Sequence, residues 1–350
     1  LLEESVKVFR RKDGAKEAVV YGAPVHYAAD GSWKDIDNTL EKVALPGGGT
    51  GYRNRSSDFT VTFAERFGTG ELVTAESGGY SLSWKFLPGT FPDPDAVAEV
   101  RNTVYPAAEK DEKERDMQLR FPEGLTSGIE YAEQGVKYVL SHKTLSEHIT
   151  LKKAPERSVE YTAEVRAEGL KPVTENGEVL LKDGSGGTVF RFSAPVMEDA
   201  AGAQSDAVKA VLSDMDPERG TFRYTLVPDA EWLHAPGRVY PVVIDPDVSP
   251  VFDGNVADTY ISNDDRTTNY YRRDRIKIGG TPHYRGLIKV RHFPRLQTGD
   301  VVLESTLNLS RYNSGVAGKL IYLHEVQVIW DPDTVTWNRL DTDSWTNINW

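Results

Sequence analysis

The sequence of 350 residues contains no cysteine. That absence excludes disulfides, zinc or iron–sulfur sites held by cysteine, and thiol nucleophiles. No run of about 18 apolar residues occurs, so we expect no segment to span a membrane. Basic residues are also in the minority, 41 against 53 acidic ones, which gives a net charge of −12. We therefore expect no nucleic-acid partner, because neutralising phosphates requires a clustered excess of Lys and Arg.

Motifs of the common enzyme classes are missing as well. His324–Glu325 has no second His four residues on, as the helix of a zinc protease requires. The sequence has no Gly-x-Ser-x-Gly elbow and no phosphate-binding Gly-rich loop. A glycosidase stays open as a distant alternative, since its two carboxylates need only be close in space. These absences predict that the chain is not an enzyme.

Apolar residues that are present alternate with polar ones. The pattern occurs in Phe59–Phe63, Tyr80–Phe86, Leu307–Leu309 and Val326–Trp330. A period of two with β-branched and aromatic side chains indicates half-buried strands. The 30 Gly and 19 Pro residues favour many short elements over a few long helices. The sequence therefore predicts an all-β protein of β-sandwich or jelly-roll domains, with antiparallel sheets and little helix.

Local patterns predict the structure of one segment and leave that of another undecided. Asn176–Gly177 and Asp183–Gly184 separate three short apolar runs, and such pairs supply the positive φ angles of tight turns. We expect a three-stranded meander over Leu170–Phe192. Ser205–Met215 fits either a short helix or a strand, because its periodicity is too short to decide.

The expected organisation has two parts. Residues 1–246 form a β-rich region, either undivided or split into two sub-domains near the charged run at 105–120. Residues 247–350 form a second module, and the boundary is placed near Val248–Gly254 because a proline-bearing segment ends there. The chain opens on Leu1–Leu2–Glu3–Glu4, which is no signal peptide, so we expect it to begin within a longer protein.

Several segments of the first part carry a resemblance to a known family. They are Tyr21–Tyr27, Trp33–Leu40, Pro195–Ala200, Trp232–Leu233 and Arg238–Pro246. Together they resemble the N-terminal region of secreted RHS/YD-repeat proteins of the wall-associated protein A type, although Tyr-Asp repeats are absent from this stretch. In such polymorphic toxins this region precedes a repeat shell that encloses a C-terminal toxic domain. The resemblance implies a bacterial protein that is secreted or bound to the cell surface, and it favours a strand for Ser205–Leu212.

The second part resembles another module, of the DNRLRE type. The matching segments, in order, are Asp258–Ile261, Ile276–Gly279, Arg285–Val290, Leu303–Ser310, Trp330–Asp331 and Thr334–Asn338. The module is similar to carbohydrate-binding β-sandwiches of secreted bacterial proteins. It normally continues for further strands, so we expect the chain to end before the last of them.

Aromatic residues of this module are the candidate ligand site. Sugars stack on aromatic faces, and loop aromatics often make contacts. The candidates are Tyr260, Tyr270, Tyr271, Arg285, Trp330 and Trp337, in a module that also contains Tyr284, Tyr312, Tyr322, Trp345 and Trp350. For Trp330 and Trp337 the period-two pattern favours packing in the core over stacking on sugar.

Arg285 and two acidic residues complete the predicted site. We expect Arg285 to pair with Asp258 and order the sheet edges, since a buried Arg needs an acidic partner. Asp264 and Asp265 are weak candidates for Ca²⁺, which takes six to eight oxygen ligands. Their spacing is not that of an EF-hand, which favours a solvated turn, so no cofactor is expected.

Two functions of different kinds follow. In the first, the chain is a non-catalytic attachment region that binds cell-wall or matrix glycan. In the second, it is a scaffold that packs on the downstream RHS repeat shell of the same polypeptide and binds no glycan. A glycan-active enzyme is a distant third.

Overall fold

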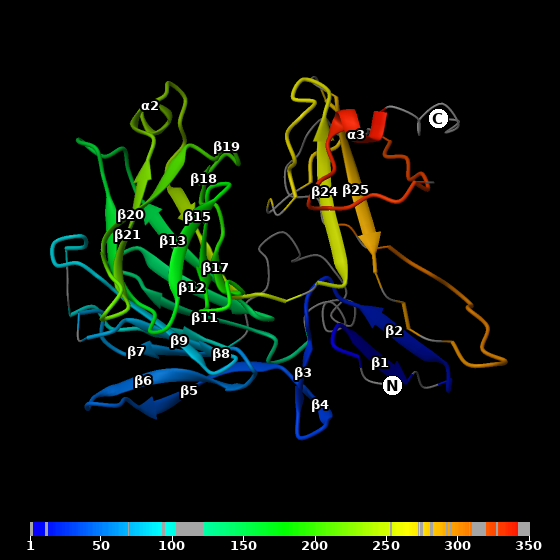
Figure 1. Cartoon of the computed structure of the whole chain (residues 1–350), viewed down its shortest axis with the longest axis horizontal. Coiled ribbons are helices and arrows are strands. Elements are labelled where there is room, and N and C mark those ends of the chain that lie inside the picture. Colours follow the sequence, from blue (N-terminus) through cyan, green and yellow to red (C-terminus); the bar gives the residue numbers. More distant parts are fainter. Residues whose placement is uncertain are drawn as a thin grey trace. The chain divides into compact units, whose positions relative to one another are not determined.

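The computed structural model shows an all-β protein, as the alternation of apolar residues predicts (Figure 1). The strand pairs of its large sheets are antiparallel in the residues that the structure describes. These residues are 3–10, 13–68, 70–92, 95–102, 122–252, 254–271, 273, 276–280, 283–291, 293–294, 296–307, 309, 320–326 and 328–341.

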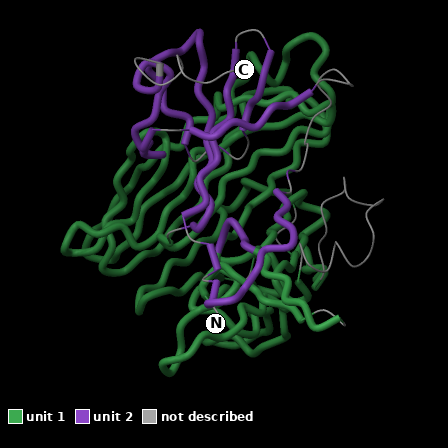
Figure 2. Tube along the Cα trace, turned by 90° about the vertical axis from the view of Figure 1, so that its right-hand side faces the viewer, with its two compact units in different colours: residues 1–19, 24–253 green, residues 20–23, 254–350 purple. Residues whose placement is uncertain are grey.

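The chain divides into two compact units (Figure 2). Unit 1 comprises Leu1–Val19 and Pro24–Asp253, and unit 2 comprises Val20–Ala23 and Gly254–Trp350. The charged run at 105–120, where a further division was expected, lies outside the described residues.

Unit 1 contains two large sheets. The eight strands of the first sheet, in spatial order, are β20 (Val208–Asp216), β21 (Thr221–Pro228), β14 (Tyr161–Arg166), β9 (Tyr80–Phe86), β8 (Val73–Ser77), β7 (Thr60–Ala64), β6 (Thr50–Ser56) and β5 (Asp37–Ala44). The main path of the second sheet is β10 (Glu99–Arg101), β11 (Thr126–Tyr131), β12 (Val136–Ser141), β13 (Thr144–Leu151), β23 (Asp247–Pro250), β17 (Thr188–Phe192), β16 (Glu178–Lys182) and β15 (Lys171–Glu175).

Shorter elements complete the two units. In the second sheet, β22 (Val242–Asp245) pairs with β13 and β18 (Val196–Asp199), and β18 pairs with β19 (Gln204–Ser205). The other elements are β1 (Val6–Arg10), β2 (Lys16–Val20), β3 (His26–Ala29), β4 (Ser32–Asp35), α2 (Ala230–Leu233), β24 (Val256–Ser262), β25 (Tyr284–Val290) and α3 (Trp337–Asp341).

The two large sheets share one core. Phe59, Val61 and Phe63 are all buried in it, as their spacing predicts. Trp84 of β9 and Tyr138 of β12 meet there from opposite sheets, with ring centroids 6.3 Å apart. Each large side chain that is fully removed from water contributes about 1.5–3 kcal/mol. Packing between the sheets, rather than any single strand pair, therefore stabilises unit 1.

The predicted meander is confirmed, with a difference in its second turn. Strands β15, β16 and β17 pair in series, and Asn176 and Gly177 have φ angles of 51° and 82° in the first turn. In the second connection the positive φ falls at Gly186, at 87°, and not at Asp183–Gly184. Asp183 Oδ1 instead accepts the N–H groups of Ser185 and Gly187, which makes a longer loop.

Two further expectations have different outcomes. Most of Ser205–Met215 is extended, because Val208–Ser213 pairs with β21, and an irregularity follows at Asp214, whose φ is 46°. Leu307–Leu309 and Val326–Trp330 are not strands in the described residues. Leu307 and Leu309 are about half exposed, whereas Val326 and Val328 pack against a small core cluster. Alternation thus marked the buried side of Val326–Trp330, but among the described residues neither segment has a strand neighbour that would make it part of a sheet.

The motif at Arg238–Pro246 fixes a loop of unit 1. Arg238 donates to Asp199 Oδ2 at 2.7 Å, and its guanidinium carbon lies 3.3 Å from the ring centroid of Trp232. Asp199 also accepts the backbone N–H groups of Ala201 and Ala203. Burial acts to raise the pKa of Asp199, but the bonds from Ala203 and Arg238 outweigh it and hold this pKa below its usual value. The motif residues therefore tie α2 to the turn after β18.

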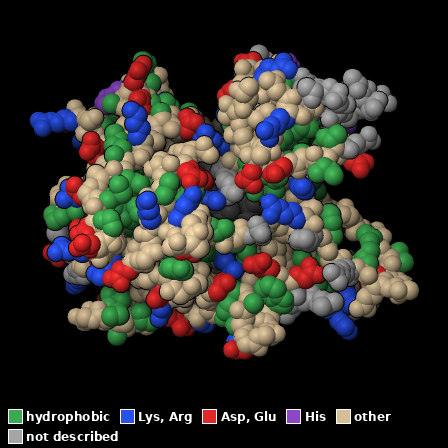
Figure 3. Space-filling model, viewed as in Figure 1, with side chains coloured by type: hydrophobic (Ala, Val, Ile, Leu, Met, Phe, Trp, Pro, Cys, Tyr) green, Lys and Arg blue, Asp and Glu red, His purple; other side chains and the backbone are tan. Residues whose placement is uncertain are grey.

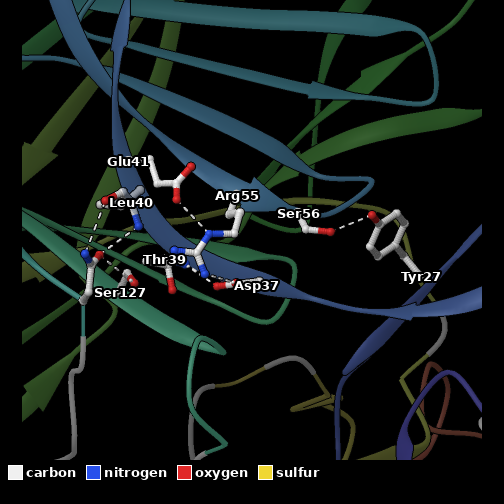
Figure 4. Close-up of polar contacts among 9 residues, drawn as sticks. Tyr27, Asp37, Thr39, Leu40, Glu41, Arg55, Ser56 and Ser127 are labelled. Carbon is white, nitrogen blue, oxygen red and sulfur yellow. Dashed lines mark hydrogen bonds and ion pairs between the residues drawn. The ribbon is translucent and has the colours of Figure 1, made fainter.

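The motif at Trp33–Leu40 has a similar structural role (Figure 4). Arg55 of β6 donates to Asp37 at 2.6 Å and to Glu41 at 2.8 Å. Asn38 is fully buried and donates to the carbonyls of Leu125 and His142. Leu125 directly precedes β11, and His142 lies in the turn between β12 and β13, so both belong to the second sheet. The motif thereby joins the outermost strand of one sheet to the other.

Candidate functional site

Strands β24 and β25 build the framework of unit 2. They pair antiparallel in a continuous register, with Tyr260 opposite Gly286 and Ile261 opposite Arg285. Because side chains alternate along a strand, this hairpin has two distinct faces. One face carries Tyr260 and Tyr284, and the other carries Ile261, Arg285, Leu287 and Lys289.

The first face is an aromatic cluster. Tyr260 is buried, and the ring of Tyr270 stacks on it at 4.3 Å and 18°. Tyr284 meets Tyr260 edge-on at 5.7 Å. Lys277 places Nζ 5.6 Å from the centroid of Tyr260 and 5.5 Å from that of Tyr284. Offset stacks and cations near ring faces are favourable arrangements, so the four residues form one unit, which we call the tyrosine face.

Polar groups orient the outer ring of the tyrosine face. Tyr270 donates its hydroxyl to Asp265 Oδ2 at 3.0 Å. Burial, followed by the carboxylate of Asp265, raises the pKa of Tyr270 above its usual value. The bonds from Thr268 and Tyr270 hold the pKa of Asp265 below its usual value. Near neutral pH the site thus offers the neutral phenol of Tyr270 and the carboxylate of Asp265, with the exposed side chain of Lys277 beside the rings.

The loop that carries Tyr270 is bonded to the segment 332–338 of unit 2. Asn269 donates its side-chain amide to the carbonyls of Pro332 and Val335, at 2.8 and 2.7 Å. The backbone N–H of Asn338 donates to the carbonyl of Arg266. Arg266 Nε also donates to the side-chain oxygen of Asn338 at 2.9 Å. Two side chains of the loop, those of Asn269 and Arg266, therefore hold it to this segment together with backbone groups.

The opposite face of the hairpin is a small core. Trp330 and Trp337 are 9% and 6% exposed and pack with Ile261, Leu287, Val335 and Leu340. The guanidinium carbon of Arg285 lies 4.8 Å from the Trp337 ring centroid. Lys289 donates to the carbonyl of Trp330 at 3.1 Å, and its Nζ lies 5.7 Å from that ring centroid. Each buried indole on this face therefore has a cationic side chain close to its ring.

The six predicted ligand residues therefore do not form one site. Tyr260 and Tyr270 lie together in the tyrosine face, whereas Arg285, Trp330 and Trp337 lie on the other face of the hairpin. Tyr271 is half-buried, and its N–H donates to Asn269 Oδ1. Trp345, Trp350 and Tyr312 lie outside the described residues. The sequence analysis did not predict Lys277 as a residue of the tyrosine face. The one signal was that Lys277 lies within Ile276–Gly279, a segment that resembles the DNRLRE-type module.

The expected pair of Arg285 and Asp258 does not form. Asp258 stands opposite Ile288, so its side chain shares a face with Tyr260, and Arg285 projects from the other side. Period-two geometry places residues of opposite parity in register on opposite faces. Burial raises the pKa of Asp258.

Metal ligands do not converge in the described part of the chain. No group of three or more His, Cys, Asp or Glu residues there could hold an ion. Of the two Ca²⁺ candidates, Asp265 accepts from Tyr270, and its N–H lies 3.4 Å from Ser262 Oγ. Within the same described ranges, no helix has the length and apolar character needed to cross a bilayer.

Comparison with known proteins identifies distant relatives. The chain is 21% identical over 273 residues to the tRNA(Glu)-specific nuclease WapA of Bacillus subtilis subsp. natto, and equally to the tRNA nuclease WapA of Bacillus subtilis. The matched segment covers 76% of this chain but spans only 11% of the length of these relatives. No family model matches, and no solved structure matches. The chain is thus distantly related to WapA nucleases, in agreement with the resemblance of its first part.

These relatives correct two expectations. The prediction that the protein is not an enzyme is wrong, because the relatives are named as tRNA nucleases. The exclusion of nucleic acid as a partner is contradicted by the same names. Both expectations rested on the motifs and charge of a segment that corresponds to 11% of each relative. Composition reports only on the residues counted, and it carries no information about the remainder of such a protein.

Proposed function

We propose that this chain is the attachment and presentation region of a secreted, RHS-type tRNA nuclease, and that unit 2 binds a cell-wall or matrix glycan through the tyrosine face. The distant relationship to WapA nucleases supports the first part of the proposal. In this assignment the chain works at the bacterial surface, the nuclease acts on tRNA, and unit 2 corresponds to the DNRLRE-type module.

The observation that carries the glycan assignment is the stack of Tyr270 on Tyr260. The lower ring is buried and fixes the plane of the upper one, while Asp265 fixes the rotation of Tyr270 through its hydroxyl. A ring held in this way binds a sugar without losing further side-chain entropy. Asp265 and Lys277 flank the rings with an acceptor and a donor for sugar hydroxyls.

A binding experiment tests the assignment. The folded chain is incubated with insoluble peptidoglycan, teichoic acid and acidic polysaccharides, and the bound fraction is measured after sedimentation. We expect Tyr270→Ala, alone or with Tyr271→Ala, to reduce binding at least about tenfold, the effect of losing a central aromatic contact. Tyr322→Ala is the matched control, because Tyr322 is 72% exposed and lies outside the tyrosine face. Equal losses in both variants contradict the assignment.

A scaffold role is the second candidate, and exposed apolar residues favour it. Leu303, Leu320, Leu323 and Ile329 are between 68% and fully exposed in the described part of unit 2. Exposed apolar surface of this kind marks protein contacts. If no glycan binds the folded chain, and the chain instead binds a purified RHS repeat region, the scaffold role replaces the glycan role.

The nuclease assignment has its own test. The full-length protein is incubated with total tRNA, and cleavage is followed on a denaturing gel. Site-specific cleavage supports it, and intact tRNA under conditions where the protein is folded contradicts it. Because this assay does not involve glycan, its result is independent of the binding experiment.

A further inference from the structure

The charge of this chain is unevenly distributed along its sequence. Residues 254–291, which supply the hairpin and the tyrosine face, contain eight basic and four acidic residues, a net charge of +4. The whole chain has a net charge of −12, so the remaining residues carry −16. An asymmetry of this kind reports on the partner of a surface rather than on the fold. The segment that builds the candidate site is therefore opposite in sign to the rest of the chain.

Lys277 differs from several lysines of unit 1 in its surroundings. In unit 1, Lys42 pairs with Glu65 at 2.6 Å and Lys85 pairs with Glu164 at 3.0 Å. Acidic and basic side chains are accordingly interspersed over the face of unit 1 in view in Figure 3. Among the described residues, no carboxylate pairs with Lys277, whose ammonium instead lies near tyrosine rings. Its charge is thus not balanced within the described part of the fold.

The acidic residues near the tyrosine face have other positions and other partners. Asp265 accepts the hydroxyl of Tyr270 at 3.0 Å. Asp258 lies on the same face of the hairpin, but its partner in register stands four residues past Tyr284 along β25. Four residues of a strand span about 13 Å. The exposed ammonium of Lys277 can therefore pair with an anion of a ligand.

We propose that the glycan bound by the tyrosine face is a polyanion, and that Lys277 selects it by pairing with a phosphate or carboxylate group beside the sugar that stacks on Tyr270. The inference rests on the proposed glycan function and names the class of glycan. Lys277 Nζ lies 5.6 Å from the centroid of Tyr260, on which Tyr270 stacks at 4.3 Å. The backbone N–H of Arg273 donates to the carbonyl of Tyr270 at 3.4 Å, which places a second basic residue in the same loop.

The rings next to Lys277 make it suited to select a charged ligand. Tyr260 and Tyr284 meet edge-on at 5.7 Å, and Nζ lies within 5.6 Å of both centroids. Attraction between a cation and ring faces keeps the ammonium near them. A group held before the ligand arrives loses less side-chain entropy on binding. An exposed ionic contact changes affinity by up to about fivefold, and a neutral glycan gains nothing from it.

Two polymers with the same sugar backbone test this selection. Polygalacturonate carries a carboxylate on each sugar, and its methyl ester carries none. We expect the folded chain to bind the acid form about fivefold more tightly than the ester, as measured by dissociation constants from affinity electrophoresis. Teichoic acid, whose charge is a phosphodiester, distinguishes the two anions. Tighter binding of teichoic acid than of polygalacturonate assigns phosphate as the selected group, and the reverse order assigns carboxylate.

Variants of Lys277 connect the preference to this residue. Lys277→Gln should lose the preference for the acid form, whereas Lys277→Arg should keep it. Lys209→Gln in unit 1 is the matched control, because Lys209 is exposed and the change in net charge is the same, and it should keep the full preference. Salt at 1 M shortens the Debye length from about 10 Å at 0.1 M to about 3 Å. The difference between the unmodified chain and Lys277→Gln should therefore shrink in 1 M salt.

Several results overturn the inference. Equal binding of acid form and ester by the unmodified chain does so, and it leaves glycan binding itself standing. So does an equal loss of both polymers in Lys277→Gln, because Lys277 then acts only through the rings, or an equal effect of Lys209→Gln. Single-stranded RNA is a polyanion that also stacks on aromatic rings, so tighter binding of polyuridylate than of any anionic glycan overturns it as well. A chain that binds none of these polymers contradicts the inference, and one that also leaves peptidoglycan unbound contradicts the proposed function.

Discussion

Tyr138 donates a hydrogen bond of 2.6 Å to the carboxyl group of Glu147 between the two sheets of unit 1. The indole N–H of Trp84 donates to the same oxygen at 3.2 Å. Burial raises the pKa of Glu147 to about 7, against the bonds from Tyr138 and Trp84, and nearby Asp245 adds to the rise. The core therefore contains an acid that changes its charge near neutral pH.

The first prediction concerns Glu147 and pH. The folded pKa of about 7 lies above the ordinary value of 4.5. Between these two pH values, Glu147 is protonated in the folded state and ionised in the unfolded chain. Stability is thus highest below about pH 4.5 for this group and falls as the pH rises through about 7, by about 3 kcal/mol in all. Glu147→Gln should remove this part of the slope in urea titrations at different pH values. Exposed Glu218→Gln is the control, and an unchanged slope in Glu147→Gln contradicts the prediction.

The second prediction compares two buried tyrosines beside this carboxyl. The hydroxyl of Tyr224 is buried without a hydrogen-bond partner in the described residues, next to a cavity of about 10 Å³ that Glu147 also lines. Removing an unsatisfied hydroxyl is close to neutral, so Tyr224→Phe should change the free energy of unfolding by less than about 1 kcal/mol. Tyr138→Phe, which breaks the bond to Glu147, should lower it by about 1–3 kcal/mol above pH 7. Equal effects in chemical denaturation would show that the two hydroxyls have equivalent surroundings.

The third prediction tests the loop held by Arg238. The side chains of Arg238 and Asp199 are 11% and 2% exposed. Arg238→Ala leaves a buried carboxylate without its cation and should lower the free energy of unfolding by about 3 kcal/mol. Asp199→Asn keeps an oxygen for the N–H groups of Ala201 and Ala203 and should cost less, about 1–2 kcal/mol. Thermal unfolding of both variants checks the order, and the reverse order contradicts it.

The fourth prediction tests how Asn269 supports the tyrosine face. Asn269→Asp replaces an amide that donates to Pro332 and Val335 by a carboxylate that cannot donate. We expect the fluorescence of the nearby indoles to shift and glycan binding to fall about as far as in Tyr270→Ala, while the unfolding of unit 1 stays the same. Thr268→Ser, one residue away, should leave the emission unchanged. An unaltered emission spectrum in Asn269→Asp would show that these bonds do not hold the loop.

Local patterns predicted the strands of unit 1 well because their cause is local. Phe59, Val61 and Phe63 are all buried since alternation alone puts them on one side of a strand. Asn176–Gly177 forms its turn because these two residues tolerate positive φ. Asp183–Gly184 failed as a tight turn because Gly186, two residues on, takes the positive φ. Leu307–Leu309 has the alternation of a strand but lacks a neighbour to pair with in the described residues.

The candidate site was predicted less completely. Tyr260 and Tyr270 were both named, but their stack depends on where the loop that carries Tyr270 returns. The pair of Arg285 and Asp258 failed because register, which a single sequence does not reveal, places them on opposite faces. Asp199 and Arg238 lie in segments that carry the family resemblance. In the structure they form an ion pair that holds a loop of unit 1.

The sequence by itself determined the class of this protein: antiparallel strands and no disulfides, because alternation, turn residues and the absence of cysteine act within a few neighbours. The tertiary structure alone decided which strands pair and that Glu147 faces Tyr138 and Trp84. Those features join segments far apart in the chain. Their partners are selected by the burial of whole faces, which no local stretch of sequence specifies.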